Sequence, residues 1–586
     1  MTETRLITVR YTGQGAGEGP LTLGQDNMIR CILHDEPMEI NKHALWPVPE
    51  GVDLDTALGA LRTLAERHEA LRTRYPGPRD RQPTTQVVHA EGEFDVAIVE
   101  LGPGEDPDEV AEEAGRRFRA MRFDLAEHFP LRFTLVTEDG RPARLSVVVC
   151  HAAADGAATA LLIGEWYELA SGRALDPVAG PTPRELAVLE RSTSGARRTK
   201  ASLRHWEKIL MHGPQAVFAD GGVGPSAGRL HTLIVRSVSA AEALQATAER
   251  TAASPSAIML AAYTALVAHR ADQPKVVVAA LSSNRHRPGL EQYVGTLAQD
   301  ALMCLDADAA DFDRLIAAAG TAGLTGYWHS TFDSEAIWSL IDETAYRRGA
   351  RFARHVVLND LSTTVPEAAT RNRPDPPADP DLAWLPAEYI PVRLMLNIWR
   401  LRDCVELSLS TDPQLFGRDD TERFARGMLS LLRESATRAV PLAELGELTG
   451  IERVRREGGQ WHRIEDSWID LHAVSHLLDA ALDKRPSLVE VGDGRLVARI
   501  VQDGRPITPG EAHRAVMDVL FSQPKTTGAL DDPPWAENSG VSGALSGWET
   551  ACAPHEYVIH DDSPLIPDDP ASWSGLPVVA RGDGRD

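Results

Sequence analysis

The chain has 586 residues, of which 43% are hydrophobic and 25% are charged, and it carries a formal net charge of −25. This is the composition of a globular protein with enough apolar side chains for large cores, and the length corresponds to about three or four domains. The negative charge argues against nucleic acid and anionic membranes as partners, because the field of the protein would repel phosphates.

Two further features indicate a cytoplasmic protein that does not enter a membrane. The apolar runs are far shorter than the about 20 residues of a membrane-spanning helix. The start, MTETRLITVRYTG, has no basic region followed by an apolar one, as a secretory signal would have. The five cysteines show no CxxC spacing, so the sequence predicts neither a disulfide framework nor a zinc site. We expect a protein that acts on small molecules.

The first predicted unit, residues 1–175, mixes helix and strand. Apolar side chains recur at three- and four-residue spacing over 54–68 and predict an amphipathic helix. Asp53 lies where a helix N-terminus favours negative charge. The β-branched runs FDVAIVEL (94–101) and RLSVVVC (144–150) predict strands. The combination favours an α/β (α+β) class over an all-α or all-β fold.

A Pro/Gly break at 176–183 introduces a second α/β unit, residues 176–440. Ser254 followed by Pro255 predicts a helix start, and the helix that follows is apolar almost all round, which is typical of a buried helix. The segment KVVVAALSS predicts a strand that leads into the loop NRHRPGL. Residues 363–392 contain RNRPDPPADPD and are predicted to form a polar surface loop.

The third unit, residues 441–586, makes up a quarter of the chain and carries 25 acidic and 13 basic residues, about half of the net charge. Its segment SLVEVGDGRLVARIV predicts a β-hairpin that turns at Asp493 and Gly494. We therefore expect a small α+β domain after the two larger units.

The sharpest local pattern is VVVCHAAADGAATALL, in which a strand ends at Cys150 and Gly156 opens an apolar helix. Between them, His151 has the side chain best suited to proton transfer near neutral pH, and Asp155 can hold the loop. Small alanines leave room for a substrate beside the imidazole. Judged from spacing alone, a lone histidine at the end of a strand is more often a structural hydrogen-bonding residue than a catalytic one. A metal pair with Asp155 is disfavoured, because no third and fourth ligand follow at matching spacing.

These residues resemble a known family. CHAAADG is similar to the HHxxxDG motif of the condensation domains of nonribosomal peptide synthetases, with His151 on the second, catalytic histidine. LTLGQDNMI resembles the opening motif and places Gln25 on its glutamine, and RHEALRT is nearly identical to the second motif. FDLAEHFPLRFTLV and NRHRPGLEQYVGTLAQ match two further motifs, the latter through Arg285. The five motifs occur in the family's order across roughly 440 residues.

The resemblance implies two lobes, each similar to chloramphenicol acetyltransferase, arranged as a V-shaped pseudo-dimer with the catalytic loop in a channel between them. An acyl group would arrive as a thioester on the phosphopantetheine arm of an acyl or peptidyl carrier protein, and a small-molecule amine or alcohol would attack it. His151 would act as a base, as a positioning group or as both, and Asp155 would pair with Arg285. No resident cofactor or metal is implied.

The sequence departs from the family in places. The family's first histidine is Cys150 here, and a cysteine that ends a buried strand is more often inert core than a nucleophile. Asn284 replaces a glycine and Gln299 replaces an asparagine, so the donor channel is expected to have an unusual shape. The arginines of NRHRP could instead bind phosphate, but the ion-pairing role of Arg285 is preferred.

The third unit resembles the small C-terminal subdomain of adenylation enzymes through GGQWHRIEDSWIDLHAVSHLLDAALDKRPSLVEVGDGRLVARIV and its closing segment. Where that subdomain carries a catalytic lysine, this chain has Asp568, Asp569 and Pro570. We therefore expect no activation of an acid by ATP, and a role for this unit in docking or in packing on the second lobe.

The sequence contains no serine segment of a carrier domain, and the condensation-like unit starts almost at once. We expect a free-standing acyltransferase of natural-product biosynthesis that forms amides or esters. An acyl-CoA-dependent acyltransferase of the same fold and a non-catalytic recruitment protein are the alternatives. Epimerisation would need a carrier-bound aminoacyl group and an additional acid, which the sequence does not place.

Overall fold

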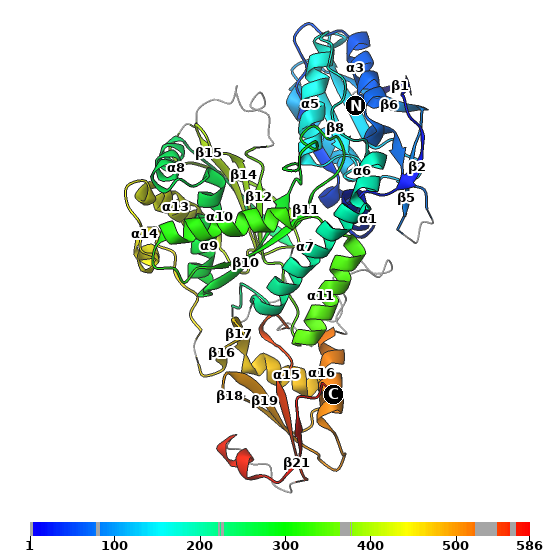
Figure 1. Cartoon of the computed structure of the whole chain (residues 1–586). Helices are drawn as coiled ribbons and strands as arrows, with labels where there is room; N and C mark the ends of the chain where they lie inside the picture. Colours follow the sequence, from blue (N-terminus) through cyan, green and yellow to red (C-terminus); the bar gives the residue numbers. More distant parts are fainter. Residues whose placement is uncertain are drawn as a thin grey trace.

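A computed structural model describes residues 4–77, 82–220, 223, 228–363, 376, 378–456, 458–521, 548–562 and 570–585. Two lobes built on mixed sheets lie side by side, and the end of the chain forms a third, smaller body below them in Figure 1. Each body has its own cluster of buried apolar side chains.

The first lobe is built on a five-stranded sheet in the order β1-β6-β7-β8-β3, in which only β6 and β7 run parallel. Its strands are β1 (Thr4–Thr12), β3 (Lys42–Trp46), β6 (Glu91–Glu100), β7 (Leu131–Glu138) and β8 (Arg141–Val149). Its helices are α1 (Leu23–His34), α2 (Pro37–Ile40), α3 (Leu54–Arg67), α4 (Pro107–Arg119) and α5 (Gly156–Ala170). A three-stranded sheet adds β2 (Gly17–Pro20), β4 (Thr73–Arg74) and β5 (Thr85–Val88).

The elements predicted for this lobe are confirmed. The helix expected over 54–68 is α3, and the Asp53 carboxylate caps it by accepting from Thr56 N–H at 2.8 Å. The two β-branched runs lie in β6 and β8, the strands on either side of the central strand β7.

Two helices, α6 (Pro183–Glu190) and α7 (Thr193–His212), lead from the first lobe to the second. On α6, Arg184 pairs with Glu69 of the first lobe at 2.8 Å. On α7, His205 bonds Leu302 O of the second lobe at 2.8 Å. The predicted domain limits at 175 and 440 stay predictions.

The second lobe is built on a seven-stranded sheet in the order β11-β10-β12-β14-β15-β9-β13. Its strands are β9 (Arg229–Ser237), β10 (Lys275–Ser282), β11 (Gln299–Asp306), β12 (Val356–Asp360), β13 (Asp381–Tyr389), β14 (Leu394–Arg400) and β15 (Val405–Thr411). Its helices are α8 (Val238–Thr251), α9 (Pro255–Ala271), α10 (Phe312–Trp328), α11 (Ser334–Arg348), α13 (Arg418–Ser435) and α14 (Leu445–Thr449). The predicted buried helix is α9, which Ser254 caps and whose side chains fill the core.

Among the described residues, no single helix has the length and apolar character needed to cross a membrane. Helices α8 and α9 meet that test only as a pair, and they are bent by 103° at the break between them.

The prediction of a surface loop over 363–392 is wrong for its second half, because Asp381–Tyr389 forms the edge strand β13. Its side chains alternate, and Leu382 and Trp384 pack against the core of the lobe. Trp384 Nε1 also donates to Glu422 at 3.0 Å. Pro386 lies within β13, where the register with β9 shifts between Leu385 and Glu388. A proline is tolerated at such an irregular point of an edge strand.

The third body is a small α+β unit. Its elements are β16 (Trp461–Ile464), β17 (Ser467–Asp470), α15 (Leu471–Ala481), β18 (Ser487–Gly492), β19 (Arg495–Val501), α16 (Pro509–Phe521), β20 (Glu556–His560) and β21 (Val578–Gly582). The predicted hairpin is confirmed as β18 and β19, and Asp493 and Gly494 take the positive φ values that its tight turn requires.

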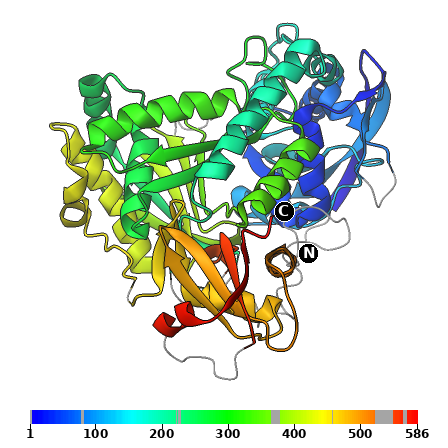
Figure 2. The same ribbon diagram turned by 60° about the horizontal axis from the view of Figure 1, so that its bottom comes forward.

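The third body is joined to the second lobe, as Figure 2 shows from below. Gln215 donates from its side chain to the carbonyls of Glu549 and Ala551, both at 2.9 Å. The buried Arg393 bridges Asp412 of the lobe, at 2.7 Å, and the carboxylate of Glu549, at 3.2 Å.

Candidate functional site

The loop from Cys150 to Asp155 lies between strand β8 and helix α5. Cys150 N–H donates to Pro130 O at 2.8 Å, and Ala153 N–H donates to Cys150 O at 3.0 Å. The Asp155 carboxylate ends the loop as the N-cap of α5 by accepting from Ala158 N–H at 2.9 Å. The loop is therefore fixed at both ends by hydrogen bonds of the first lobe.

His151 is buried in this loop, with 8% of its surface exposed. Burial and the positive charge of Lys42 lower the pKa of the imidazole to about 4, although Asp155 acts in the opposite direction. Within the described residues, no other side chain bonds its buried Nδ1 atom. The imidazole is thus neutral near pH 7, and a neutral imidazole offers one nitrogen as a hydrogen-bond acceptor.

Asp155 and Arg285 form a buried ion pair across the two lobes, at 2.9 Å from Nη1 to Oδ2. The same oxygen accepts from the N–H groups of Leu297 and Ala298, at 2.8 and 3.2 Å. Burial raises the pKa of Asp155, but the charge and hydrogen bond of Arg285 and these N–H donors outweigh it, so the pKa lies below its usual value. The ion pair that the family resemblance implies is confirmed.

The remaining contacts of Arg285 stay within its own segment. Its Nη2 donates to Tyr293 O at 3.1 Å and to Gly295 O at 3.0 Å, and Nη1 donates to Ser283 O at 3.2 Å. Arg285 thus ties the 283–299 segment together and, through Asp155, fastens it to the loop that carries His151. These contacts occupy both Nη atoms and disfavour a phosphate at Arg285 itself.

Gly156 is exposed at the start of α5, directly after the buried Asp155. A Cβ atom built on it would meet no atom within 4 Å. The backbone of Gly156 does not require glycine, because its φ is not positive. Its missing side chain therefore leaves open space at the end of the histidine loop.

Gln25 has a structural position in the first turn of α1. It forms a capping box with Thr22, with distances of 2.8 and 3.0 Å, and its Nε2 donates to Tyr75 OH at 3.3 Å. Tyr75 OH in turn donates to Ala152 O at 3.0 Å. Gln25 and Tyr75 thereby connect α1 to the backbone of the residue after His151.

A family model described as the condensation domain matches residues 18–442. The chain belongs to the condensation-domain family. The β16–β21 body lies outside the matched residues.

The condensation domain of this chain is similar to parts of much larger synthetases. AMB antimetabolite synthetase AmbB of Pseudomonas aeruginosa is 31% identical over 252 residues, which are 42% of this chain and 20% of AmbB. Tyrocidine synthase 3 of Brevibacillus parabrevis is 26% identical over 406 residues, which are 67% of this chain and 6% of the synthase. The matches thus span a fifth or less of the length of these two relatives.

Solved structures share the fold at low identity. The first condensation domain of the calcium-dependent antibiotic synthetase has a TM-score of 0.57 and 18% identity, over 73% of this chain and 98% of that domain. SgcC5 from Streptomyces globisporus has a TM-score of 0.55 and 20% identity, over 72% of this chain and all of SgcC5. The X-domain in its complex with OxyB from teicoplanin biosynthesis has a TM-score of 0.55 and 21% identity, over 74% of this chain and 97% of that chain.

Two substitutions in the family motifs of this condensation domain have structural explanations. Asn284 has a φ of 54°, a left-handed conformation that asparagine tolerates better than most residues. Its side chain donates to Leu297 O and Ser330 O, at 2.9 and 3.2 Å. Gln299 donates to Phe332 O at 2.8 Å. Both side chains are buried and brace the segment that carries Arg285.

Cys150 packs among apolar side chains with 2% of its surface exposed, and burial raises the pKa of its thiol to about 11. A neutral, enclosed thiol is a poor nucleophile. We expect iodoacetamide to leave Cys150 unmodified in the native condensation domain at pH 8 and to modify it after unfolding, as peptide mass spectrometry would show. Rapid modification of Cys150 in the native protein would contradict the inference that its thiol is unreactive.

Sequence reasoning missed two contributors to this site. Tyr75 lies two residues beyond the RHEALRT motif, and that proximity was the available signal. Lys42 lies on β3 opposite Val149 of β8, which places its charge near His151. Nothing in the sequence near Lys42 indicates this pairing, because 107 residues separate it from Val149.

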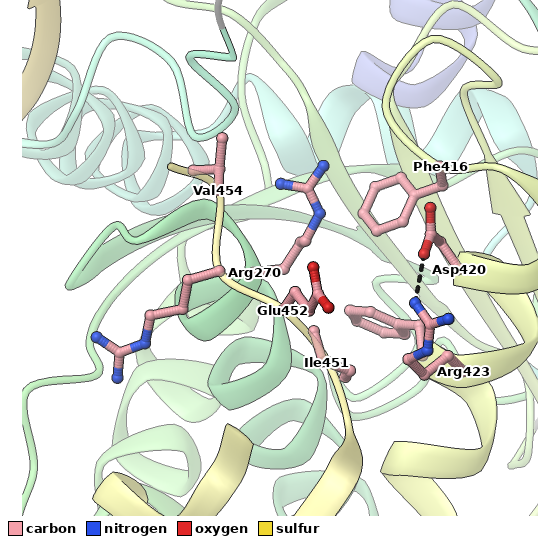
Figure 3. A pocket seen from close by; sticks show the side chains of 9 residues that line it. Arg270, Phe416, Asp420, Arg423, Ile451, Glu452 and Val454 are labelled. Carbon is pink, nitrogen blue, oxygen red and sulfur yellow. Dashed lines mark hydrogen bonds and ion pairs between the residues drawn. The ribbon is translucent and has the colours of Figure 1, made fainter. Parts of the chain in front are cut away.

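A cavity of about 180 Å³ lies elsewhere in the second lobe (Figure 3). It is lined by Arg270, Phe416, Asp420, Arg423 and residues of the segment 451–454 that leads to the third body. None of residues 150–156 lines it, so the cavity is separate from the loop that carries His151.

Proposed function

We propose that this condensation domain transfers an acyl group from a carrier-protein thioester to an amine or hydroxyl acceptor. The carrier would be a separate protein that delivers its phosphopantetheine arm to His151. The single observation that carries the proposal is the buried, neutral His151 in a loop fastened across both lobes by Asp155 and Arg285.

In this reaction the acceptor nitrogen or oxygen forms a bond to the thioester carbonyl carbon, and the bond from that carbon to the pantetheine sulfur breaks. The acceptor loses a proton and the sulfur leaves as a thiol. A neutral imidazole accepts the hydrogen bond of the attacking N–H or O–H and holds it toward the carbonyl. Because a pKa of about 4 makes a weak base, positioning of the acceptor is expected to supply much of the acceleration.

The function is tested by intact-mass and product analysis with a panel of acyl-carrier thioesters, acyl-CoA thioesters and small acyl thioesters. Each donor is combined with amine and alcohol acceptors. Transfer from carriers supports the proposal, and transfer from acyl-CoA alone would favour the CoA-dependent alternative. A carrier that binds tightly without any transfer would favour recruitment, for which the X-domain complex with OxyB is the structural precedent.

Gly156→Leu is expected to keep the fold and to lower kcat/KM by about tenfold or more, because the new side chain enters the open space beside the loop. Gly164→Leu is the matched control: this glycine lies on the same helix, is exposed and also has open space at its Cβ. Thermal unfolding and steady-state kinetics check both variants. Equal activities in the two variants would show that the space at Gly156 holds no substrate.

The β16–β21 body is proposed to be non-catalytic and to serve packing. Its sequence resembles the small subdomain of adenylation enzymes. Pro570 lies in a short helical turn, whereas Asp568 and Asp569 lie outside the described residues. The contacts of Gln215 and Arg393 with the 549–551 segment hold the β16–β21 body against the second lobe.

A further inference from the structure

Helix α7 presents a basic face on a protein of net charge −25. Over its 20 residues the helix carries five basic side chains and one carboxylate, Glu207. The five basic residues are exposed: they are Arg197, Arg198, Lys200, Arg204 and Lys208, and we call them the α7 basic face.

Helical spacing places most of these charges in one row. Arg197, Lys200, Arg204 and Lys208 follow one another at three- and four-residue steps, which puts them on the same side of a helix. Among the described residues, none of the five forms an ion pair with a carboxylate, and Glu207 is bound to Arg347 of α11 at 2.7 Å. The charges are therefore available to a partner.

Exposed apolar side chains lie beside this row. Leu324 and Trp328, near the end of α10, are 78% and 64% exposed. The next residue, His329, stacks on His205 of α7 at 4.9 Å, and the Trp328 ring lies 6.4 Å from the ring of His286. The two helices meet in both views of the molecule (Figures 1 and 2).

The same surface is joined to the catalytic loop through a short stretch of chain. His286 directly follows Arg285, whose guanidinium holds Asp155. Burial, then the charge of Arg287 and then that of Arg198 lower the pKa of the His286 imidazole, so Arg198 lies near this residue. A partner on the α7 basic face would thus lie over the segment that crosses between the lobes.

We propose that the α7 basic face, together with Leu324 and Trp328, is the docking surface for an acidic carrier protein. The inference rests on the proposed function and names where its donor binds. Charge complementarity calls for an acidic partner, and apolar residues beside the charges suit a protein interface. A convex, exposed helix face does not suit a small ligand such as CoA, because small-molecule sites are concave.

The test compares the double variant Lys200→Glu, Arg204→Glu with wild type. Binding is measured by fluorescence anisotropy, using acidic holo-carrier domains labelled on the pantetheine thiol as probes. Transfer is measured with the same carriers in acylated form and with a small acyl N-acetylcysteamine thioester. The double variant Arg62→Glu, Arg426→Glu is the matched control, since both residues are exposed on helices of the two lobes and the change in charge is identical.

We expect carrier affinity and carrier-dependent kcat/KM to fall about tenfold or more in the α7 variant, with little change in the control. Transfer from the small thioester should be unchanged. Raising the salt concentration should weaken carrier binding in wild type more than in the α7 variant, because it screens exposed charges. Trp328→Ala should weaken binding and leave this salt dependence in place.

Three outcomes would overturn the docking inference: unchanged carrier affinity in the α7 variant, a carrier affinity too weak to detect in wild type, or an equal loss of rate with acyl-CoA. Transfer from the small thioester distinguishes these failures from a failure of the function. If that transfer persists, the acyltransferase proposal stands and the docking surface lies elsewhere.

Discussion

Replacing His151 with alanine is expected to lower the rate of acyl transfer by about 100-fold or more, the range found when an acid–base or positioning group is removed. The variant should remain folded, since the imidazole makes no bond to another residue at Nδ1 in the described part of the chain and is buried in its neutral form. The measurement is steady-state transfer with the donor that works best for wild type, alongside thermal unfolding.

His269→Ala serves as the control, because His269 is also 8% exposed and burial also lowers its pKa, yet it lies on α9 and bonds Ile451 O. Transfer that continues unchanged in His151→Ala would leave proximity alone as the source of acceleration. Titration of His151 should not change the wild-type rate between about pH 5.5 and 8, because its pKa of about 4 keeps the imidazole neutral throughout this range. A loss of rate centred near pH 6.5 in wild type and absent in His151→Ala would contradict the lowered pKa.

The second large effect is expected for Arg285→Ala. This change leaves the Asp155 carboxylate buried without its partner, and breaking a buried pair in this way costs about 3–5 kcal/mol of unfolding free energy. Chemical denaturation measures the loss. Arg438→Ala is the control: its pairs with Glu434 and Glu444 are exposed, and such pairs contribute about 1 kcal/mol or less.

The free energy of unfolding, measured as a function of pH below neutrality, gives a second test of the Asp155–Arg285 ion pair. The pKa of Asp155 is lowered in the folded state, so its stabilisation is present above the unfolded pKa of about 3.9 and is lost as pH falls through the lower, folded pKa. The difference in stability between wild type and Arg285→Ala should therefore shrink below about pH 4. A difference that stays constant down to pH 2 would show that the ion pair is not its source.

The sequence by itself determined the local elements and the order of the motifs. Periodicity placed α3, the cap at Ser254 placed α9, and the Asp493–Gly494 turn placed the last hairpin. These succeed because helix faces, caps and tight turns are set by residues within a few positions of one another. Edge strand β13 was missed by the same reasoning, because the prolines and aspartates before it hide a short alternation. Pairing with β9 and packing of Leu382 and Trp384 on the core stabilise this strand, and both depend on distant parts of the chain.

Tertiary structure alone decided the chemistry of the site. The neutral state of His151 follows from burial and from Lys42, which reaches it only through the pairing of β3 with β8. The partnership of Asp155 with Arg285 was expected from the family resemblance, but its strength depends on burial and on backbone donors more than 130 residues away. Desolvation and charge act through space, so the ionisation of these groups is set by neighbours that the order of the residues does not reveal.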